Sequence, residues 1–534
     1  MGRVATLGLS RGRGVAVRLA LGLAALVWFL VRVVPKPSRA AYPCQRAAFP
    51  LASAFVLWLA GVVAGGALFR GTVSRWKLTG VARAGWGLLL ASSGAAWLLI
   101  STSAQPTAAE SVPAPSPSVP PTPAQSVPAW SPSDPPNKPV GVARGLHPGR
   151  VTWIRDLAAT PWDGTTGHWW DDDTGVRQDV ADRMLSRSLL ALTGAATDEE
   201  AWARIFRHTN RERGRGDVGY AEGERIAFKI NCNNAYAGYA DADNQADASP
   251  QSVLAMVRQL VKHAGVPADR ITVYEAVRVV PDRVYTKTHR EFPGVVFVDS
   301  QGDGTNGRQP VEWQEDVLAY SVETPGVGRR VPRCVRDATY LVNMALLKGH
   351  PTTGVTLTAK NHYGTVDVRD HRVYANSSKH PMGIYHPFVD MIGSSQLGGK
   401  TLLFMIDGLY GLRDVNDDVA QHGHWKTLFG GEWLASYFLS LDPIAIDSVG
   451  LDFLAAEFPE GRGGNPAPIT NADNFLHEGA RADAPPSGTA YHPNGRPLAS
   501  LGVHEHWNNA TARQYSRDLG TGEGIELYRV EPAR

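Results

Sequence analysis

The segment YLVNMALLKGHPTTGVTLTAKNHYG, residues 340–364, decides the fold class of this chain. Its first part is almost entirely apolar, as in a strand that is buried on both faces of a sheet. The remainder is polar and rich in glycine and threonine, as in a loop that follows such a strand. Similar apolar runs occupy residues 226–230, 271–274, 295–298 and 401–406. Runs of this length and composition predict a set of central strands.

Helical patterns separate these strands. Thr197 is followed three residues later by Glu200, a capping box that predicts a helix start. Ser249 and Asp442 each precede a proline, which is the form of an N-cap followed by the first helical position. The helix after Asp442 is expected to continue to about residue 458. Strands that alternate with helices predict an α/β fold with a mainly parallel sheet flanked by helices.

The N-terminal region has a different composition. Twelve basic residues and no acidic residue precede Glu110, so 41 of the 53 Lys and Arg residues remain after it, against all 51 Asp and Glu residues. Three apolar stretches lie in this region, at residues 19–31, 49–69 and 84–104. The last two are long enough to cross a bilayer as helices. The first is shorter, and a signal-peptide core is the alternative to a span. We expect residues 1–104 to form a three-span helical membrane anchor.

The basic residues also predict the orientation of this anchor. Arg3, Arg11 and Arg13 precede the first stretch, and four basic residues separate the second from the third, against Lys36, Arg39 and Arg46 between the first and second. After the third stretch no Lys or Arg occurs until Lys138. This modest bias places the N-terminus in the cytoplasm and all residues after 104 outside it. Residues 105–140 contain 12 prolines and are expected to form a semi-rigid linker, with a proline-rich ligand for a partner as the alternative. Residues 141–534 then form an extracytoplasmic α/β domain. Abundant alanine and arginine are typical of a high-GC bacterium, so the inner membrane is the expected location.

Polar residues that follow the predicted strands form the candidate site, because parallel sheets bind ligands beyond the carboxyl ends of their strands. Lysines supply point charges, threonines and asparagines supply short donors, and glycines let the backbone approach a ligand. This combination suits a phosphate or a carboxylate. The candidate anion-binding residues are Lys229, Asn231, Asn233, Lys348, Thr353, Thr356, Asn361 and Gly364. A glycine-rich turn with solvated lysines is the alternative.

Three further residues are candidates for catalysis, namely His350, Lys360 and Asp447. The pKa of a histidine lies near neutrality, so His350 is the candidate general acid or base. Asp447 shares an apolar helical stripe and is expected to be buried, where it needs a donor, a lysine or a metal. Asp407 and Asp442 are candidate ligands of a divalent metal, together with His350 and His362. For Asp442 a helix N-cap is the alternative.

Several functions are disfavoured by the sequence. The part after Glu110 is net acidic and lacks a basic stripe, so no nucleic-acid partner is expected. No Gly-x-Ser-x-Gly motif is present, and a serine hydrolase therefore lacks its usual signature. His422 and His424 lie beside acidic residues, but the spacing does not fit a calcium loop, and a solvated loop is expected. Whether Cys232 and Cys334 form a disulfide is left open.

Together the motifs resemble those of the family called domain of unknown function 362. They are FKIN at 228–231, LKGH at 347–350, GVT at 354–356, KNHYG at 360–364, DG at 407–408 and DPIAID at 442–447. The resemblance covers about residues 220–460, and YPCQR at 42–46 is similar to a membrane-anchored bacterial branch. Some members of that family carry iron–sulfur segments. Two cysteines cannot ligate a four-cysteine cluster alone, so no iron–sulfur cluster is expected here.

Two classes of function follow. The first is an enzyme that acts on a small anionic substrate held by Lys229, Lys348 and Lys360. The second is a non-enzymatic envelope protein that uses the same pocket to bind a ligand or to assist the assembly of a membrane complex, with its protein partner unknown. Both require the lysines to converge on one pocket, with several lysine nitrogens within roughly 10 Å of one another and with Asp407 and Asp447 near the edge of the pocket. Lys229 and Lys360 on opposite faces of the sheet would contradict the anion pocket, and with it the enzyme hypothesis.

Overall fold

The computed structural model describes residues 134–532, apart from 236–237, 241, 316, 325–326, 352, 368–381 and 460–471. All of these described residues belong to the compact unit Gln125–Arg534. The three predicted spans and most of the predicted linker lie outside them. Within the described ranges, no helix combines the length and the hydrophobicity that a membrane span requires.

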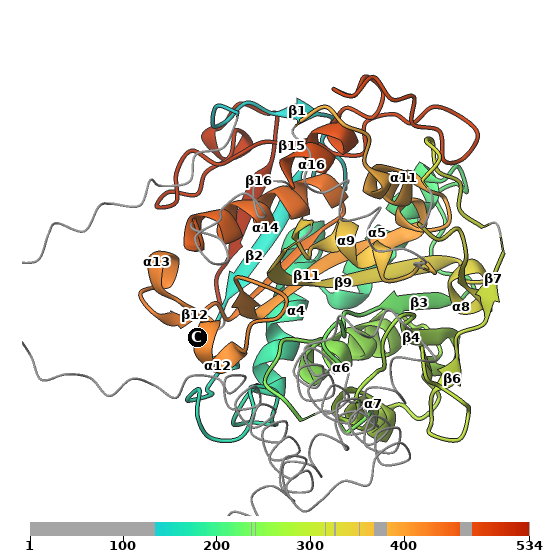
Figure 1. The fold of residues 1–534 in the computed structure, drawn as a ribbon, viewed down its shortest axis with the longest axis vertical. Coiled ribbons are helices and arrows are strands. Elements are labelled where there is room, and N and C mark those ends of the chain that lie inside the picture. The colour runs from blue at the N-terminus through green and yellow to red at the C-terminus, as the bar shows by residue number, and fades with distance from the viewer. Residues whose placement is uncertain are drawn as a thin grey trace, which may run out of the picture. The chain divides into compact units, whose positions relative to one another are not determined.

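A ten-stranded sheet forms the centre of the domain (Figure 1). Along the sheet the main strands are, in order, β16 (Glu526–Val530), β2 (Arg150–Arg155), β14 (Ser436–Ser440), β11 (Thr401–Leu412), β9 (Tyr340–His350), β3 (Ile226–Lys229), β4 (Ile271–Glu275), β5 (Val296–Asp299) and β6 (Gln309–Pro310). β14 runs antiparallel to both of its neighbours, and the other pairs in this order are parallel. β10 (Gly354–Val355) adds a short antiparallel pair with β9. The predicted α/β class with a mainly parallel sheet is confirmed.

The order of the strands reverses between β3 and β9. From β3 the chain proceeds outward through β4, β5 and β6, and it then returns to place β9 and β11 on the other side of β3. Such a reversal is a topological switch point, and open α/β sheets bind ligands in the crevice outside the strand ends at that point. Lys229 ends β3, and Lys348 lies near the end of β9. The fold therefore brings two of the predicted segments to the switch point.

Helices cover both faces of the sheet (Figure 1). One face carries α9 (Thr358–Tyr363), α11 (Pro387–Gly393), α14 (Pro443–Glu457) and α16 (Asp473–Ala480). The other carries α4 (Gln178–Thr193), α5 (Asp198–Glu212) and α6 (Pro250–Arg258), with α7 (Asp282–Glu291) packed on α6. The predicted caps are confirmed at Thr197, Ser249 and Asp442, each of which accepts a backbone N–H of the helix that it precedes.

Side chains of the central strands alternate between two hydrophobic cores. In β9, Leu341 and Ala345 belong to the core on the α14 face, whereas Val342 and Met344 belong to the core on the α6 face. This alternation follows from the pleat of a strand, in which successive side chains point to opposite faces. Both faces of the sheet are buried, which explains why the strands appear in the sequence as continuous apolar runs rather than as alternating ones.

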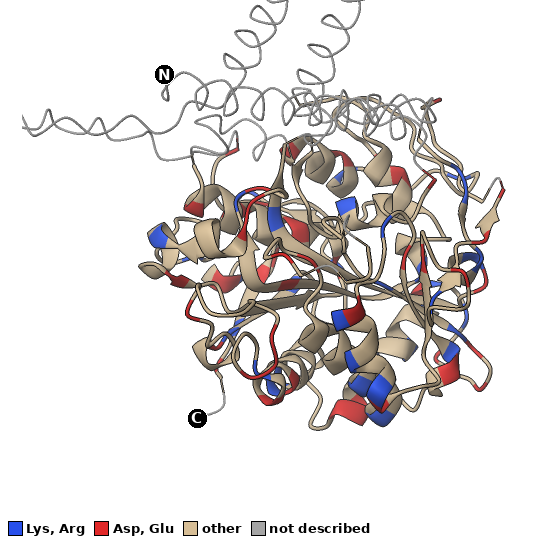
Figure 2. Cartoon of the chain, turned by 60° about the horizontal axis from the view of Figure 1, so that its bottom comes forward, with Lys and Arg blue, Asp and Glu red and all other residues tan. Residues whose placement is uncertain are grey.

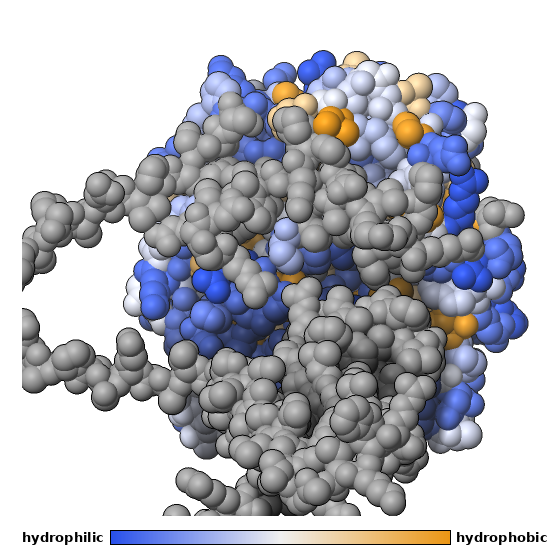
Figure 3. Space-filling model, in the orientation of Figure 1, coloured by the Kyte–Doolittle hydropathy of each residue, from blue (hydrophilic) through white to orange (hydrophobic). Residues whose placement is uncertain are grey.

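Short elements complete the domain. They are the helices α8 (Arg333–Arg336), α12 (Val419–His422) and α13 (Lys426–Phe429), and the strand pairs β1 (Val140–Gly141) with β15 (Val503–His504), β7 (Trp313–Gln314) with β8 (Val331–Pro332), and β12 (His424–Trp425) with β13 (Glu432–Trp433). Lys and Arg residues are intermixed with Asp and Glu residues over the described domain (Figure 2). The face seen in Figure 3 is mostly hydrophilic where described residues are visible.

Candidate functional site

Lys229 lies at the carboxyl end of β3 and is held on the α9 side of the sheet. Its side chain is only 1% exposed. Nζ forms an ion pair with Glu275 at 2.8 Å and lies 3.5 Å from Oδ1 of Asn361, a residue of α9. It also donates to the carbonyl oxygen of Ile230. A buried lysine needs such partners, because an isolated charge in the protein interior is costly. Glu275 therefore neutralises Lys229 within the fold.

Asn361 joins α9 to the sheet. Its Nδ2 donates to Oδ1 of Asn343 at 2.8 Å and to the carbonyl oxygen of Met344 at 3.1 Å. Its Oδ1 accepts a hydrogen bond from Nδ2 of Asn231 at 3.2 Å. In return, Nδ2 of Asn343 donates to the carbonyl oxygen of Thr358 at 2.9 Å. The amide of Asn361 is thus fully used in positioning α9 above β9 and β3.

Gly364 leaves room for the Lys229 ammonium. A Cβ atom at residue 364 would lie 3.1 Å from Nζ of Lys229, which is tighter than an ordinary van der Waals contact. Its backbone has an ordinary right-handed conformation, with φ −69°. Space, rather than conformational freedom, is therefore the reason for glycine at this position.

Asp447, a residue of α14, fixes the N-terminus of α9. Its Oδ1 accepts the backbone N–H of Thr358 at 2.8 Å and the Thr358 hydroxyl at 2.7 Å, and its Oδ2 accepts the backbone N–H of Ala359 at 2.9 Å. The residue belongs to α14 and is completely buried, as the sequence predicts. Burial raises the pKa of its carboxyl group to about 7. These contacts make Asp447 a positioning residue for α9.

Lys360, the next residue of α9, lies close enough to Lys229 for their charges to interact. Burial, followed by the positive charge of Lys229, lowers the pKa of Lys360 to about 7. Its Nζ also lies 5.1 Å from the ring centroid of Tyr363. Lys229 contacts α9 directly, so the two lysines share one face of the sheet. The arrangement that would have contradicted an anion site, with these lysines on opposite faces, is not present.

Lys348 extends instead toward the segment that precedes α6. Its Nζ donates to the carbonyl oxygen of Ala246 at 2.7 Å, and the side chain is fully buried. Burial lowers the pKa of Lys348 to about 8, although nearby acidic groups, Asp247 first among them, oppose this shift. Asp247 is therefore the main acidic neighbour of Lys348, whereas Glu275 is the ion-pair partner of Lys229.

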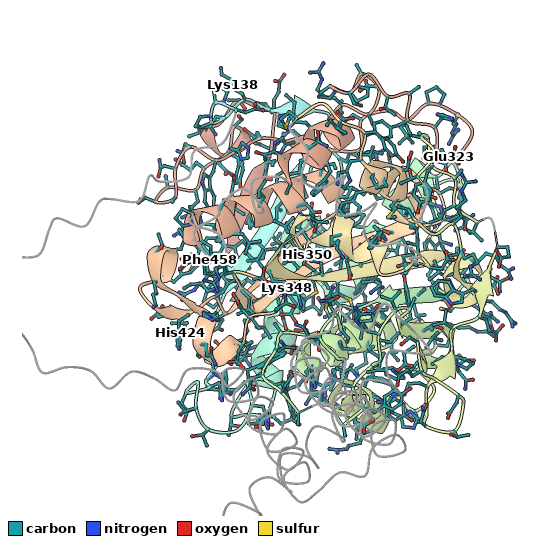
Figure 4. The ribbon with its side chains drawn as sticks, viewed as in Figure 1. Lys138, Glu323, Lys348, His350, His424 and Phe458 are labelled. Atoms are coloured by element: carbon teal, nitrogen blue, oxygen red, sulfur yellow. The ribbon has the colours of Figure 1, made fainter. Side chains whose placement is uncertain are left out.

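His350 is half-buried at the end of β9, where Figure 4 shows it beside Lys348. The backbone N–H of Thr353 lies 3.4 Å from its Nδ1. The Thr353 hydroxyl donates to the carbonyl oxygen of Val355, whereas the buried Thr356 hydroxyl has no hydrogen-bond partner among the described residues. Thr356 therefore offers a hydroxyl to a ligand more readily than Thr353 does.

Asn233, His362 and the two cysteines are the remaining residues that the sequence singled out on this part of the chain. The backbone carbonyl oxygen of Asn233 accepts a hydrogen bond from Nε of Arg278 at 3.1 Å. His362 is buried, with no hydrogen bond to either ring nitrogen among the described residues, and burial lowers its pKa to about 3. Cys232 and Cys334 are both free thiols, and burial raises the pKa of each.

The two carboxylates expected to bind metal do not meet. Asp442 is the N-cap of α14: its Oδ1 accepts the N–H groups of Ile444 and Ala445, and its Oδ2 accepts that of Arg144. Asp407 lies on the α6 side of the sheet, where its Oδ1 accepts the backbone N–H of Leu409 at 3.1 Å and burial raises the pKa of its carboxyl group to about 6. Among the described residues, neither carboxylate belongs to a group of three or more metal-ligating side chains.

The structure differs from the predicted site in two respects. The expectation that Asp407 and Asp447 border one pocket is not met, because the pleat of β11 directs Asp407 to the face opposite α9. The expectation also omitted Glu275, the ion-pair partner of Lys229. Glu275 is the last residue of β4, so the rule that polar residues at strand ends form the site would have found it.

Residues 226–452 match the sequence profile of the family described as Domain of unknown function (DUF362). The chain therefore contains a DUF362 domain, and the resemblance inferred from its motifs is confirmed over this range. The matched range includes β3, β9, α9 and the first part of α14, and with them the candidate residues described above. No curated protein and no solved structure was found to match the chain.

Proposed function

We propose that this domain binds a small phosphate- or carboxylate-bearing anion beside α9, at the switch point between β3 and β9. The observation that carries the proposal is the position of Lys360. It lies on a helix that Asn361 fixes to the sheet and Asp447 fixes to α14, and it shares that face with Lys229. Glu275 neutralises Lys229, but the pKa of Lys360 remains lowered to about 7. A bound anion supplies the negative charge that would raise it.

If the domain is an enzyme, Lys360 and His350 are the residues that would transfer protons to and from the substrate. A lysine whose pKa lies near neutrality exchanges a proton readily at physiological pH, unlike an ordinary lysine. His350 is the last residue of β9, and its imidazole is a second titratable group. The substrate would be held by its anionic group, with the Thr356 hydroxyl as an additional donor.

A non-enzymatic form also has support. Lys229 is satisfied within the fold by Glu275, and the amide of Asn361 is used entirely in hydrogen bonds to the sheet and to Asn231. Groups committed in this way position the backbone more than they act on a substrate. The alternative is therefore a ligand-binding or assembly protein of the envelope that leaves its ligand unchanged.

Calorimetric titration of the full-length chain in detergent, with pyrophosphate and citrate as probes, tests the binding. We expect affinity to fall between pH 6 and pH 8, because Lys360 loses its proton in that range. Lys360→Gln should remove both the binding and its pH dependence. Lys262→Gln is the matched control, since Lys262 pairs with Glu291 at 2.6 Å on the surface. Binding that persists in Lys360→Gln would refute the proposal.

Mass spectrometry of anions that co-purify with the protein separates the two forms. An anion recovered in altered form after incubation supports an enzyme, and one recovered unchanged supports a binding protein. His350→Gln should abolish the alteration while leaving the affinity for the anion within about threefold. Equal loss of conversion in a surface variant such as Lys262→Gln would exclude a specific contribution of His350.

We further propose that the chain belongs to a membrane-anchored branch of the family and that residues 141–534 are extracytoplasmic. Support comes from the charge distribution around the apolar stretches before Glu110. Alkaline phosphatase fused after residue 140 should be active, whereas the same reporter fused after residue 75 should be inactive. The reverse pattern would show that the orientation is wrong.

A further inference from the structure

A cluster of histidines and aspartates is formed by residues outside the DUF362 domain. It comprises His477 of α16, His504 of β15, His506, Asp473 of α16 and Asp134. The four residues other than Asp134 are buried, and Asp134 is half-buried. Asp134 precedes β1, which pairs with β15, so the cluster lies where the chain from the linker joins the domain. None of these residues belongs to the candidate anion site.

Each of the three imidazole rings is held through its Nδ1 atom. Nδ1 of His477 lies 3.0 Å from the carbonyl oxygen of Asp473. Nδ1 of His504 lies 2.8 Å from the Ser448 hydroxyl, and Nδ1 of His506 lies 2.7 Å from Oδ1 of Asp452. Histidines that bind a metal through one nitrogen generally anchor the other to a carboxylate, a backbone carbonyl or water. The Ser448 hydroxyl takes that place for His504. All three rings therefore present Nε2 to the interior of the cluster.

The Nε2 atoms converge on the two carboxylates. Nε2 of His506 lies 3.4 Å from Oδ1 of Asp473, and Nε2 of His504 lies 4.0 Å from the same oxygen. Nε2 of His477 contacts Oδ2 of Asp134. The ligand atoms of Asp134, His477 and His504 all lie within 4.8 Å of one another, as do those of Asp473, His504 and His506. Zinc bonds of about 2.0–2.1 Å in tetrahedral geometry place neighbouring ligand atoms roughly 3.4 Å apart, so small movements would bring four of these five donors around one ion.

Two atoms of the cluster are buried without a hydrogen bond among the described residues. They are Nε2 of His504 and Oδ1 of Asp473. A buried polar atom without a partner is costly, and its presence in a folded protein requires an explanation such as an ion. His504 belongs to both groups of ligand atoms, so its unsatisfied nitrogen lies at the centre of the cluster.

We propose that Nε2 of His477, His504 and His506, with the carboxylates of Asp473 and Asp134, form a site for one divalent transition-metal ion of the zinc type. Imidazole nitrogens favour zinc and its neighbours over magnesium or calcium, which prefer oxygen ligands. The dication would be balanced by the carboxylates of Asp473 and Asp134. Its ligands come from the start of the domain, from α16 and from the β15 segment, so the ion would join three distant parts of the chain to one another.

The first experiment uses the full-length chain in detergent. Elemental analysis after purification without chelator should give about one zinc per chain, and the chelator-treated protein should take up one Zn²⁺ or Co²⁺. X-ray absorption at the zinc edge should show imidazole scattering from about three rings and no sulfur. A wild-type chain that binds no ion, or one whose zinc has sulfur ligands, would overturn the proposal. The metal-free alternative is a protonated His506 shared between Asp452 and Asp473.

Variants provide the second test. His504→Ala should lower zinc affinity at least about a hundredfold, since it removes the ligand common to both groups. His263→Ala is the matched control: His263 lies 2.7 Å from Glu199 on the surface, also as a histidine–carboxylate pair, and its loss should leave the stoichiometry at one. Asp134→Asn, at the half-buried edge, should weaken binding about tenfold or more and is less disruptive to the fold. Full occupancy retained in a folded His504→Ala protein would overturn the assignment.

Discussion

Replacing Asp447 by asparagine should make the stability of the domain less dependent on pH. The carboxyl group has a pKa of about 7 in the folded chain, because burial outweighs its three hydrogen bonds, whereas its usual value is near 3.8. A carboxyl group whose pKa is raised by folding stabilises the folded state below its unfolded pKa. That contribution is lost as the pH rises through the folded value, over the window from about pH 4 to pH 7.

The size of this effect follows from the shift. A difference of about three pKa units corresponds to about 4 kcal/mol between the ends of the window. Asparagine resembles the protonated acid in shape and charge, and its oxygen keeps the contacts with the Thr358 N–H and hydroxyl. The Ala359 N–H then faces the NH2 of the amide, which cannot accept a hydrogen bond. This loss costs about 1–3 kcal/mol of unfolding free energy at every pH. The stability of Asp447→Asn relative to the wild type should therefore improve by about 4 kcal/mol from pH 4 to pH 8.

Urea unfolding of residues 125–534, followed by circular dichroism at several pH values, provides the measurement. The free energy of unfolding of each protein is obtained by linear extrapolation, and the difference between them is compared across pH. Asp518→Asn, which changes a less deeply buried carboxyl group, controls for general effects of charge. A constant difference between pH 4 and pH 8 would refute the reasoning, because it would mean that folding does not raise the pKa of Asp447.

Three further outcomes are expected. The fragment 125–534 should be soluble and folded without the membrane region; aggregation cured only by restoring the first 104 residues would contradict this. Gly364→Ala should cost about 1–3 kcal/mol of unfolding free energy, because its Cβ crowds Nζ of Lys229, whereas Gly219→Ala, with nothing within 4 Å, should change it by under about 0.5 kcal/mol. Asn361→Ala should cost about 2–4 kcal/mol in chemical denaturation, since it leaves several buried polar groups without partners; a loss under about 0.5 kcal/mol would exclude a structural role for the network.

Local sequence patterns were sufficient for most of the fold. The apolar runs at 226–230 and 401–406 are strands because both faces of the sheet are covered, and the proline after Asp442 marks a helix start because proline lacks the N–H that this position leaves unpaired. The burial of Asp447 followed from helical spacing in the same way. Each of these predictions depends on neighbours within one turn or one strand.

The remaining features depend on which face a side chain occupies and on contacts between distant segments. Asp407 ends on the α6 side of the sheet because the pleat of β11 decides its direction, and a rule based on strand ends ignores that alternation. The pairing of Lys229 with Glu275 joins two neighbouring strands that are 46 residues apart in sequence. The histidine cluster combines residues separated by more than 300 positions, although His504 and His506, two residues apart, were a usable signal.

Helix α14 contacts both the candidate anion site and the histidine cluster. One side of it carries Asp447, which holds α9 and thus the position of Lys360; another carries Ser448 and Asp452, which hold the rings of His504 and His506. Through the position of this helix, the proposed metal binding and the proposed anion binding would be thermodynamically linked. Such linkage is reciprocal: whatever factor zinc applies to anion binding, the anion applies equally to zinc binding.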